Sequence, residues 1–366
     1  MKNISVIGIG KLGLCFALTL EKTGYNVVGL DINQNYVNSI NNKTLKSHEE
    51  NVEEYLKKST NFHATTDMKK TIEHSDLLFV VVATPSLANG RYNHAQVESV
   101  IQNIKKLGVQ NNKHFIVCCT TMPSYCDTVQ QKLEPYGYTV TYNPEFIAQG
   151  TILKDQSNPD MVLIGEGSTE IGDILENAYN KMTDNKPRIC RMSRTEAEIC
   201  KISLNCFLTT KISFANMIGD IASANNLPAE NILNAIGSDT RIGNKYLKYG
   251  YGYGGPCFPR DNRALAIFAN DIGRPAPISL ATDNMNKIHL EFQIQQFCEN
   301  TPIGETILLE SVTYKPQTII LEESQQLAFA VGIAKSGHYV IIRETQPVIN
   351  QLAEKYGDLF VYEVRK

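Results

Sequence analysis

The sequence predicts an α/β fold with a parallel, doubly wound sheet in its N-terminal half. From residue 1 to about residue 190, short apolar runs alternate with amphipathic segments, a pattern typical of strand–helix–strand units. A long proline-free segment with helical apolar spacing follows, and the alternation returns near the C-terminus. These three observations predict three parts, at residues 1–190, 191–296 and 297–366.

The first part is expected to contain one strand for each short apolar run. The runs are Ile4–Gly8, Asn26–Asp31, Leu77–Ala83, His114–Cys119, Thr139–Tyr142 and Met161–Gly165. Lys11–Thr23 is expected to be the first helix. Because helical segments connect the runs, we expect the strands to be parallel.

The second part is built on a helix from Thr195 to about Asn225, and another helix follows Pro228. A helix so long and apolar is usually buried between domains or subunits. The third part is expected to be a small α/β domain. Its predicted elements are strand Thr306–Tyr314, helix Glu322–Lys335, strand His338–Arg343, helix Pro347–Lys355 and strand Leu359–Val364.

Composition excludes several classes of protein. The chain has 366 residues, and 35 Lys and Arg against 38 Asp and Glu leave a net charge of −3. Without a basic excess, neither nucleic acid nor an anionic membrane surface is an expected partner. No apolar run is long enough to cross a bilayer, and Met1 leads straight into a strand rather than a signal peptide. A cytoplasmic protein is expected.

Nine cysteines are scattered along the chain, and no pair has Cys-x-x-Cys spacing. The number is odd, and the histidines complete no metal-ligand spacing, so neither a disulfide framework nor a metal site is expected. Most of these thiols are expected to be reduced, buried small hydrophobes.

The segment Gly8-Ile9-Gly10-Lys11-Leu12-Gly13 joins the first strand to the first helix. In a Rossmann-type domain, these glycines permit a tight turn, a close approach of pyrophosphate and close helix–strand packing. Asp31 ends the second strand at the spacing expected for a ribose-binding carboxylate, and no arginine follows within Ile32–Asn35. The sequence therefore predicts an NAD-binding domain and favours NAD over NADP. A tight turn without a cofactor is the weaker alternative.

A cysteine lies in a second glycine-rich segment, Gly254-Gly255-Pro256-Cys257-Phe258-Pro259-Arg260-Asp261. Glycines leave the thiol uncovered, and such a setting suits a nucleophile when a positive group stabilises its thiolate. On this segment alone, a turn around a buried thiol is the more common outcome. Lys201 and Asn205 share one face of the long helix and could stabilise an oxyanion, or they could simply be a solvent-reaching lysine and a packing asparagine.

Polar residues also follow several predicted strands of the first sheet. Thr84-Pro85, Thr121-Met122-Pro123 and Asn143-Pro144-Glu145-Phe146 stand where α/β sheets place their ligands. Glu145 could be a general base or a solvated loop carboxylate, and the threonines could line a cleft or simply end their strands.

The order of these motifs resembles the UDP-glucose/GDP-mannose dehydrogenase family, most of all its UDP-glucose-oxidising members. The resemblance is strong over residues 1–290, and its specific parts are Glu198-x-x-Lys201-x-x-x-Asn205 and Gly254-Gly255-x-Cys257-Phe258-x-x-Asp261. It implies a four-electron oxidation of UDP-glucose to UDP-glucuronate with two NAD per sugar, in polysaccharide precursor synthesis.

The resemblance implies a role for each matching residue. Cys257 would trap the aldehyde as a thiohemiacetal and then carry a thioester, while Lys201 and Asn205 would stabilise the oxyanion. Asp261 and Thr121 would position a water, and Glu145 would assist thioester hydrolysis. NAD contacts are implied for Gly8, Gly10, Lys11, Leu12, Gly13, Asp31, Thr84, Pro85, Thr121 and Arg260.

The resemblance also implies substrate contacts and an assembly. The loop Gly250–Gly255 would lie over the glucose, and Arg241 would reach the substrate of a neighbouring subunit in a homodimer formed through the long helix. The implied substrate-binding set is Glu145, Phe146, Lys201, Asn205, Arg241, Tyr246, Tyr249, Gly250, Tyr251, Gly254 and Lys315.

Three departures from the family pattern stand out. Gln149 replaces a second glutamate, and Arg260 replaces a lysine, which changes a point charge into a planar fork. In the shortened, UDP-binding-like third domain, Ile319, Ile320 and Glu322 replace two acids and an arginine. Two alternatives therefore stay open: a dehydrogenase of another sugar nucleotide, such as UDP-N-acetylmannosamine or GDP-mannose, and a non-catalytic nucleotide-binding relative.

Overall fold

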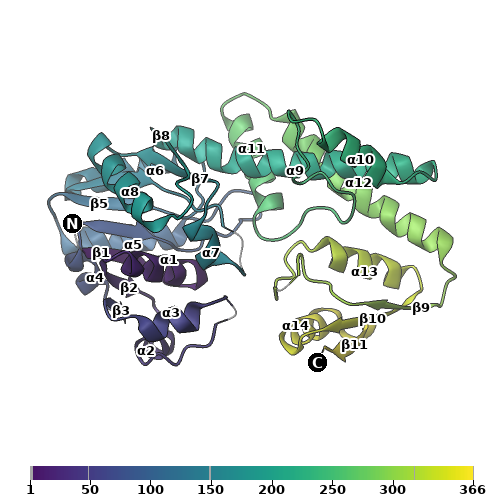
Figure 1. The fold of residues 1–366 in the computed structure, drawn as a ribbon, viewed down its shortest axis with the longest axis horizontal. Helices are drawn as coiled ribbons and strands as arrows, with labels where there is room; N and C mark the ends of the chain where they lie inside the picture. Colours follow the sequence, from purple (N-terminus) through teal and green to yellow (C-terminus); the bar gives the residue numbers. More distant parts are fainter. Residues whose placement is uncertain (1–2, 48, 148–149, 317, 366) are drawn as a thin grey trace. The chain divides into compact units, whose positions relative to one another are not determined.

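The computed structural model describes residues 3–47, 49–147, 150–316 and 318–365. The chain divides into two compact units, Met1–Lys201 (unit 1) and Ile202–Lys366 (unit 2). Unit 1 has a central sheet with helices on both faces, and unit 2 combines long helices with a small sheet (Figure 1). The two compact units divide after Lys201, which is not one of the predicted boundaries. The division into three parts therefore stays a prediction.

Unit 1 is built on an eight-stranded sheet in the order β3-β2-β1-β4-β5-β6-β7-β8. The strands are β1 Asn3–Ile7, β2 Asn26–Leu30, β3 Phe62–Thr65, β4 Leu77–Val80, β5 Lys113–Val117, β6 Tyr138–Tyr142, β7 Met161–Glu166 and β8 Arg188–Ser193. After β3 the chain crosses back to place β4 beside β1, so the topological switch point, where open α/β sheets bind their ligands, lies between β1 and β4. The predicted dinucleotide-binding domain is confirmed.

The expectation that every strand is parallel was wrong for one pair. Strands β3 to β6 run parallel, and β7 is parallel to β8, but β6 and β7 are antiparallel and pair only through Tyr142 and Gly165. The chain after β6 stays at the carboxyl edge of the sheet, so β7 enters the sheet from that edge. The alternating pattern does not reveal this reversal, and β3 and β8 were also missed.

Two apolar clusters attach the helices to the two faces of this sheet. One cluster joins α1 and α8 to one face through residues such as Leu18 and Leu175, and the other joins α5 and α6 to the opposite face through residues such as Ile101 and Val129. The helices of unit 1 are α1 Lys11–Lys22, α2 Gln34–Asn41, α3 Val52–Lys58, α4 Met68–His74, α5 Ala95–Leu107, α6 Tyr125–Leu133, α7 Ile152–Ser157 and α8 Thr169–Met182, with a 3-10 turn at Glu134–Tyr136.

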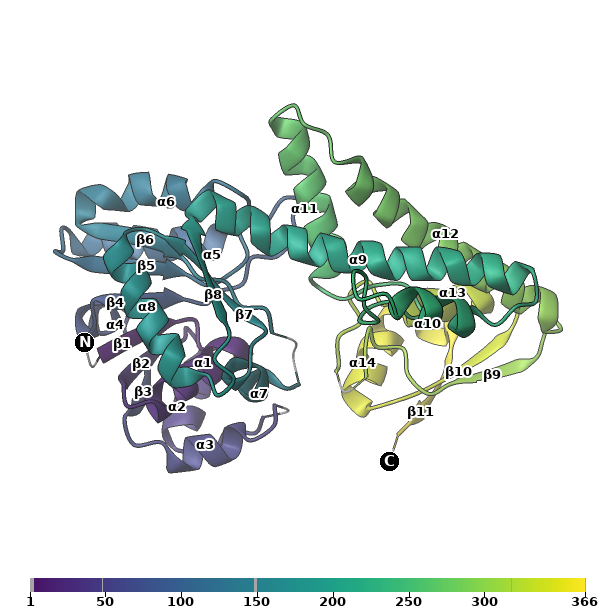
Figure 2. The same ribbon diagram turned by 45° about the horizontal axis from the view of Figure 1, so that its top comes forward.

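The predicted long helix is α9, Arg194–Ala224, which begins in unit 1 and continues through unit 2. Unit 2 adds α10 Ala229–Gly237, α11 Phe258–Asp271 and α12 Pro277–Asn300. Helix α12 packs along α9, where the Ser213 hydroxyl donates to the Thr282 carbonyl at 3.2 Å (Figure 2). The sequence did not reveal α11 or α12, although α12 carries side chains that hold the glycine-rich loop.

The C-terminal part of unit 2 is a three-stranded parallel sheet in the order β11-β10-β9. Its elements are β9 Thr306–Leu309, α13 Gln325–Lys335, β10 Tyr339–Glu344, α14 Gln346–Tyr356, a 3-10 turn Gly357–Leu359 and β11 Val361–Val364. The predicted small α/β domain is therefore present, but its first strand is shorter than expected. Ser311 and Val312 instead bind the Glu344 carboxylate at 2.6 and 3.2 Å and leave the ladder.

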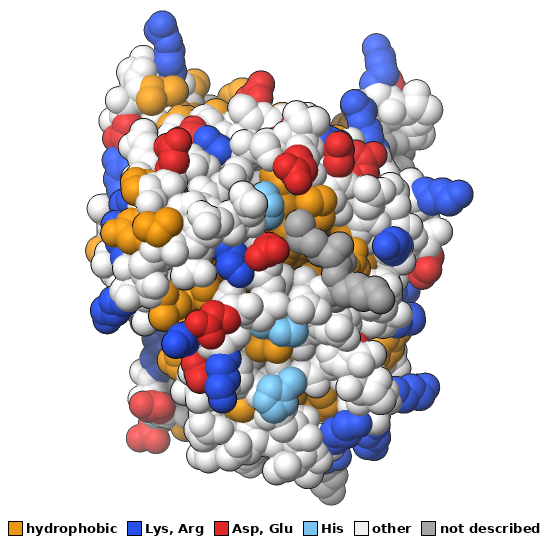
Figure 3. Space-filling model, turned by 90° about the vertical axis from the view of Figure 1, so that its left-hand side faces the viewer, with side chains coloured by type: hydrophobic (Ala, Val, Ile, Leu, Met, Phe, Trp, Pro, Cys, Tyr) orange, Lys and Arg blue, Asp and Glu red, His pale blue; other side chains and the backbone are white. Residues whose placement is uncertain are grey.

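Charged side chains of both signs are scattered over one face of the molecule. On the face seen in Figure 3, acidic and basic residues are interspersed, in keeping with the small net charge. Among the described residues, no helix combines the length and apolar character needed to cross a membrane. The cytoplasmic location expected from the sequence stays a prediction.

Candidate active site

The predicted residues of unit 1 follow neighbouring strands of the sheet. In strand order they are Asp31 after β2, Gly8–Gly13 after β1, Thr84-Pro85 after β4, Thr121 after β5 and Glu145 after β6. The five strands are parallel, so their carboxyl ends lie along one edge of the sheet. This edge is where a doubly wound sheet binds its ligand.

The three glycines of the first turn differ in what surrounds them. Gly8 has φ +92°, and a Cβ there would lie 2.5 Å from the Val81 carbonyl oxygen. A Cβ at Gly13 would lie 2.0 Å from the Gly8 oxygen, whereas one at Gly10 would meet nothing within 4 Å. Gly8 and Gly13 therefore close the turn, and Gly10 leaves an open approach to the N-terminus of α1. This cradle fits the pyrophosphate of a dinucleotide.

Asp31 stands beside this cradle, at the end of β2. Its Oδ1 accepts the Asn33 amide at 2.9 Å, which orients the carboxylate at the turn. At the end of β4, Thr84 is buried and its hydroxyl donates to the Thr120 carbonyl at 2.8 Å, while Pro85 is exposed. The ends of β4 and β5 are thereby joined.

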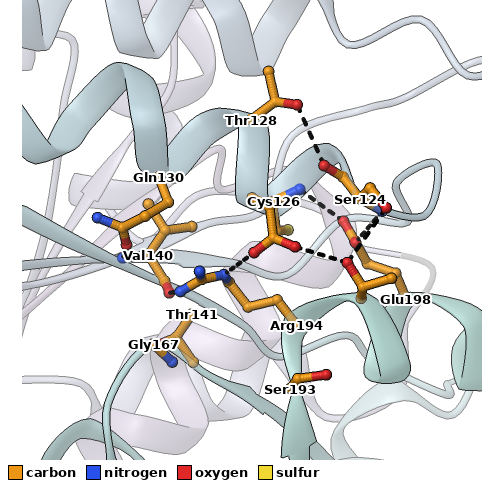
Figure 4. Close-up of polar contacts among 12 residues, drawn as sticks. Ser124, Cys126, Thr128, Gln130, Val140, Thr141, Gly167, Ser193, Arg194 and Glu198 are labelled. Atoms are coloured by element: carbon orange, nitrogen blue, oxygen red, sulfur yellow. Dashed lines mark hydrogen bonds and ion pairs between the residues drawn. The ribbon is translucent and has the colours of Figure 1, made fainter.

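Thr121 is held by a buried carboxylate from the start of α9. Its hydroxyl donates to Glu198 Oε1 at 2.8 Å. The amides of Ser124 and Cys126 donate to the same carboxylate at 2.7 and 2.9 Å (Figure 4). Thr121 and Glu198 have no exposed surface. Because the hydroxyl proton of Thr121 goes to Glu198, its oxygen can only accept from another group.

The Glu198 carboxylate projects from α9 to the N-terminus of α6. There, unpaired amides and the helix dipole favour a negative charge. Burial raises the pKa of Glu198, against the lowering effect of its hydrogen bonds. A second contact anchors the same two helices: Arg194 Nε donates to Asp127 Oδ1 at 2.7 Å, and the Thr195 hydroxyl to Asp127 Oδ2 at 2.8 Å (Figure 4). The sequence pattern assigned no separate role to Glu198, although Glu198 belongs to the same motif as Lys201.

Glu145, Phe146 and Lys201 lie together in unit 1. The Lys201 ammonium donates to the Glu145 backbone carbonyl at 2.7 Å and lies 4.2 Å from the centre of the Phe146 ring. Lys201 is buried and Glu145 is partly buried. Burial raises the pKa of the Glu145 carboxyl to about 7, against the lowering effects of the nearby Lys201 and Tyr179. A carboxyl group with this pKa can exchange protons near neutral pH.

Tyr179 of α8 is a site residue that sequence reasoning missed. Its hydroxyl donates to Asn143 Oδ1 at 2.8 Å, and the Asn143 side-chain amide donates to the Leu163 carbonyl at 2.9 Å. Tyr179 therefore ties the segment that carries Glu145 to α8. The residue sits in an ordinary amphipathic helix, and its spacing offers no signal of this contact.

In unit 2, Cys257 precedes the first residue of α11. All nine cysteines lie in the described part of the chain, and Cys257 is the one with an exposed side chain. Its carbonyl accepts the Asp261 amide at 2.9 Å, the first hydrogen bond of the helix. The N-terminus of a helix favours the anionic form of a thiol.

Asp261, four residues after Cys257, is contacted by the buried Asn205 of α9 and by the partly buried Arg260. The Asn205 amide donates to Asp261 Oδ2 at 2.7 Å, and Arg260 Nε lies 3.3 Å from Asp261 Oδ1. Asp261 has no exposed surface. An amide and a guanidinium thus satisfy the carboxylate, which links α9 to the start of α11.

The glycines before Cys257 pack against the segment that departs from the family pattern. A Cβ at Gly254 would lie 2.3 Å from the Glu323 carbonyl oxygen, and one at Gly255 would lie 2.5 Å from the Tyr314 ring. The Gly255 amide donates to the Glu322 carbonyl at 3.0 Å. Burial raises the pKa of Tyr314 to about 12, and the neighbouring Cys257 adds to this shift. Tyr314 was not predicted as a site residue.

The other predicted substrate-binding residues of unit 2 differ in their surroundings. Tyr249 and Gly250 are held by side chains of α9 and α12, and the Tyr251 ring lies 6.0 Å from the Phe329 ring. Arg241 is exposed and pairs with Asp239, its Nη2 lying 2.7 Å from Oδ2.

Tyr246 is exposed, and its ring centre lies 6.3 Å from that of Phe258. The Lys315 ammonium lies 5.8 Å from the Tyr314 ring centre. Gln149, the residue that departs from the family's second glutamate, is outside the described residues.

Comparisons with known proteins agree on one family. Residues 2–183 match the NAD binding domain of the UDP-glucose/GDP-mannose dehydrogenase family, and residues 195–288 match its central domain. A UDP-glucose 6-dehydrogenase of Rickettsia bellii is 28% identical over 348 residues, covering 92% of this chain and 80% of its own length. A GDP-mannose 6-dehydrogenase of Pseudomonas syringae pv. tomato is 30% identical over 352 residues, covering 92% and 79%.

A solved structure shows the same fold. The UDP-glucose dehydrogenase of the archaeon Pyrobaculum islandicum matches with a TM-score of 0.89 and 26% identity, over 99% of this chain and 86% of that chain. The relatives oxidise more than one sugar nucleotide, so they do not decide among substrates.

Proposed function

Because the chain belongs to the UDP-glucose/GDP-mannose dehydrogenase family, we propose that it oxidises UDP-glucose to UDP-glucuronate. As a member of this family it is a sugar-nucleotide dehydrogenase with NAD as cofactor. The proposed reaction removes four electrons from one primary alcohol and consumes two NAD and one water. UDP-glucose is preferred because the sequence resembles the members that oxidise it, and solved and curated relatives include such enzymes.

The observation that carries a covalent route is the exposed thiol of Cys257 at the N-terminus of α11. In the proposed route the alcohol is first oxidised to the aldehyde, and the Cys257 thiolate adds to the aldehyde carbon. The resulting thiohemiacetal is oxidised to a thioester, and water then releases the carboxylate and frees the thiol. Bound NAD supplies the hydride acceptor for both oxidations. The covalent intermediate keeps the aldehyde from escaping.

Lys201 and Asn205 are the proposed oxyanion-stabilising residues. A buried ammonium group stabilises a negative oxygen more strongly than an exposed one, because less water screens it. Asn205 is already oriented by its hydrogen bond to Asp261. In the proposed mechanism Lys201 and Asn205 stabilise the charge that develops on the substrate oxygen when Cys257 adds to the aldehyde.

Glu145 is the proposed base for thioester hydrolysis. A carboxyl group with a pKa of about 7 is substantially ionised at neutral pH, yet still basic enough to take a proton from water. Thr121 and Asp261 are the proposed water-positioning residues. With its proton donated to Glu198, Thr121 would accept a hydrogen bond from that water.

The dinucleotide cradle of unit 1 is proposed to hold NAD. Amides at the start of α1 would bind the pyrophosphate, and the Asp31 carboxylate would accept the ribose hydroxyls. A 2′-phosphate next to Asp31 would be repelled, so NAD is expected to bind more tightly than NADP. The proposed contacts also include Lys11, Leu12, Thr84, Pro85, Thr121 and Arg260.

A second substrate remains a specific alternative. In the segment from Lys315 to Ser324, Glu323 forms a bidentate contact with Arg263 at 2.5 and 2.9 Å, and Ile319 is exposed. Ile319, Ile320 and Glu322 of this segment replace two acids and an arginine that the family resemblance leads one to expect. A GDP-mannose dehydrogenase is also among the relatives. Oxidation of GDP-mannose is therefore the competing proposal.

We propose a homodimer formed through α9. Phe207, Phe214 and Ile221 are spaced by seven residues, so they lie on one face of the helix, and their exposed fractions are 66%, 41% and 56%. Contiguous apolar faces of this kind mark interaction sites. Sedimentation should give twice the chain mass for the wild-type protein and a monomer for Phe214→Glu; a wild-type monomer would contradict the dimer.

Substrate identity is tested by following NADH at 340 nm with UDP-glucose, GDP-mannose and UDP-N-acetylmannosamine under identical conditions. The proposal expects the highest kcat/KM with UDP-glucose. A higher value with GDP-mannose would replace the substrate while keeping the chemistry. NAD binding without NADH formation on any of the three would support the non-catalytic alternative.

A further inference from the structure

The glycine-rich loop Tyr249–Gly255 is held at its backbone by side chains from α9 and α12. Asn216 Oδ1 accepts the Gly250 amide at 3.1 Å. Further along, Asn286 Oδ1 accepts the Tyr253 amide at 2.9 Å, and Asn286 Nδ2 donates to the Tyr253 carbonyl at 3.0 Å. Both ends of the loop are therefore fixed by side-chain amides before any ligand is present.

Between these contacts, the buried ring of His289 joins the loop to α9. Its Nε2 lies 2.6 Å from the Gly250 carbonyl oxygen, and its Nδ1 lies 2.8 and 2.9 Å from the two oxygens of Asp220. Only 1% of the His289 surface is exposed. Gln293 Nε2 also donates to the Gly250 oxygen, at 3.3 Å.

The two contacts of the His289 ring require two protons. A carbonyl oxygen and a carboxylate oxygen are both acceptors, so each short distance needs a hydrogen between nitrogen and oxygen. A neutral imidazole has one N–H and would leave one of these contacts without a hydrogen. The geometry therefore describes a histidine–carboxylate pair that holds one hydrogen at each of the two contacts.

The groups that face this pair come from both helices and the loop. Asp220 projects from α9, and the Tyr249 hydroxyl donates to Asp220 Oδ1 at 3.1 Å. Burial raises the pKa of Tyr249 to about 12, with the charge of Asp220 adding to the shift and Ser223 opposing it. Tyr249 therefore stays neutral near pH 7 and remains a donor to Asp220.

The position of Tyr249 depends on a glycine of α9. A Cβ at Gly219 would lie 1.9 Å from the Tyr249 ring, so only glycine leaves room for it. The ring also lies edge-on to His289, with centres 5.7 Å apart. The Tyr249 ring therefore has a fixed position at the start of the loop. The next residue, Gly250, makes the contact with His289.

We propose that His289 and Asp220 form a positioning pair that holds the glycine-rich loop in the shape that binds the sugar nucleotide. The inference rests on the proposed function, in which this loop covers the sugar. When a substitution removes the donor to the Gly250 carbonyl or to Asp220, the loop should loosen. Binding of the sugar nucleotide should then weaken, while kcat should change little.

Two substitutions separate this role from a general structural one. In His289→Gln, the single side-chain nitrogen cannot reach both acceptors, so the KM for UDP-glucose should rise about tenfold at pH 7 with kcat within about twofold. In Asp220→Asn, the introduced side-chain amide can donate to Nδ1 of His289 while Nε2–H still donates to Gly250. This variant should keep a KM close to that of the wild type.

The decisive comparison is therefore the KM for UDP-glucose, measured beside kcat at pH 7. The wild type and Asp220→Asn should show a low KM, and His289→Gln a raised KM with kcat nearly unchanged. His338→Gln is the matched control and should keep a low KM, because His338 is also buried but neither ring nitrogen has a hydrogen-bond partner among the described residues. Equal KM values for all four proteins would overturn the proposal.

A measurement without turnover keeps the pair testable if the proposed reaction is wrong. Amide exchange of the Gly250–Gly255 peptide in the full chain should be faster in His289→Gln than in the wild type and in Asp220→Asn. Equal exchange rates in the three proteins would overturn the pair.

Discussion

The site residues of unit 1 are positioned by backbone topology, whereas those of unit 2 are positioned by side chains that connect helices. In unit 1, Asp31, Gly10, Thr121 and Glu145 follow neighbouring strands, so their shared edge is a consequence of strand order. In unit 2, no sheet aligns the described residues around Cys257. The cluster of Asn205 with Asp261 depends on one hydrogen bond between helices. Substitutions of site residues should therefore have different consequences in the two units.

The largest effect is expected at Cys257, where unit 2 supplies the chemistry. Cys257→Ser should lower the rate of carboxylate formation on the order of 10⁴-fold, because an alcohol adds to the aldehyde far less readily than a thiolate. NAD binding to unit 1 should be unchanged, which calorimetry can check. Wild-type rates of acid formation in this variant would remove the thioester route.

Two glycines of one turn can separate folding from cofactor binding in unit 1. Gly13→Ala places a Cβ 2.0 Å from the Gly8 oxygen and should cost about 3 kcal/mol in the free energy of unfolding. Gly10→Ala meets nothing within 4 Å, so its stability should be unchanged while NAD binding weakens. Denaturant unfolding and NAD titration measure the two effects. Equal stability losses would contradict the distinction drawn between these glycines.

Glu145 tests whether unit 1 contributes a base as well as a cofactor site. The carboxylate is the basic form, so hydrolysis should slow as pH falls, by about fivefold between pH 7 and pH 6 for a pKa near 7. Glu145→Gln should lower the rate of thioester hydrolysis about 100-fold and remove this pH dependence. Single-turnover release of UDP-glucuronate measures it, and an unchanged profile in the variant would assign the base elsewhere.

The smallest expected effect concerns the buried anchor at Glu198. Glu198→Gln leaves one oxygen for three donors and should lower the free energy of unfolding by about 2 kcal/mol. The matched control is Glu196→Gln, because Glu196 lies on the same helix, is exposed and binds only Ser193. That control should change stability by less than about 0.5 kcal/mol. Equal losses would show that the Glu198 contacts add nothing to unit 1.

This contrast also explains what could be predicted from the sequence. Gly8–Gly13 and Asp31 carry a spacing that only one local structure satisfies, so the strand–turn–helix and its ligand class could be predicted. The reversed strand β7 could not, because strand direction depends on where the preceding chain lies. Tyr179 could not either, since its contact with Asn143 joins residues 36 positions apart through packing alone.

In unit 2, the local sequence pattern indicated the exposure of Cys257 but did not indicate which residues surround it. The glycines indicated an uncovered thiol, and its exposure agrees with that interpretation. His289 lies in helix α12, which the sequence pattern did not reveal, and its partner Asp220 is 69 residues away. The residues around His289 in the sequence do not indicate its contacts. The fold, not the local sequence, brings an acceptor to each ring nitrogen.

The most direct test of the central claim is the number of NADH formed per UDP-glucose when the sugar nucleotide is limiting and NAD is in excess. Four-electron oxidation through Cys257 predicts two NADH per sugar, with UDP-glucuronate as the product. One NADH per sugar, with the aldehyde released, would contradict the claim that the chain carries both oxidations to the acid.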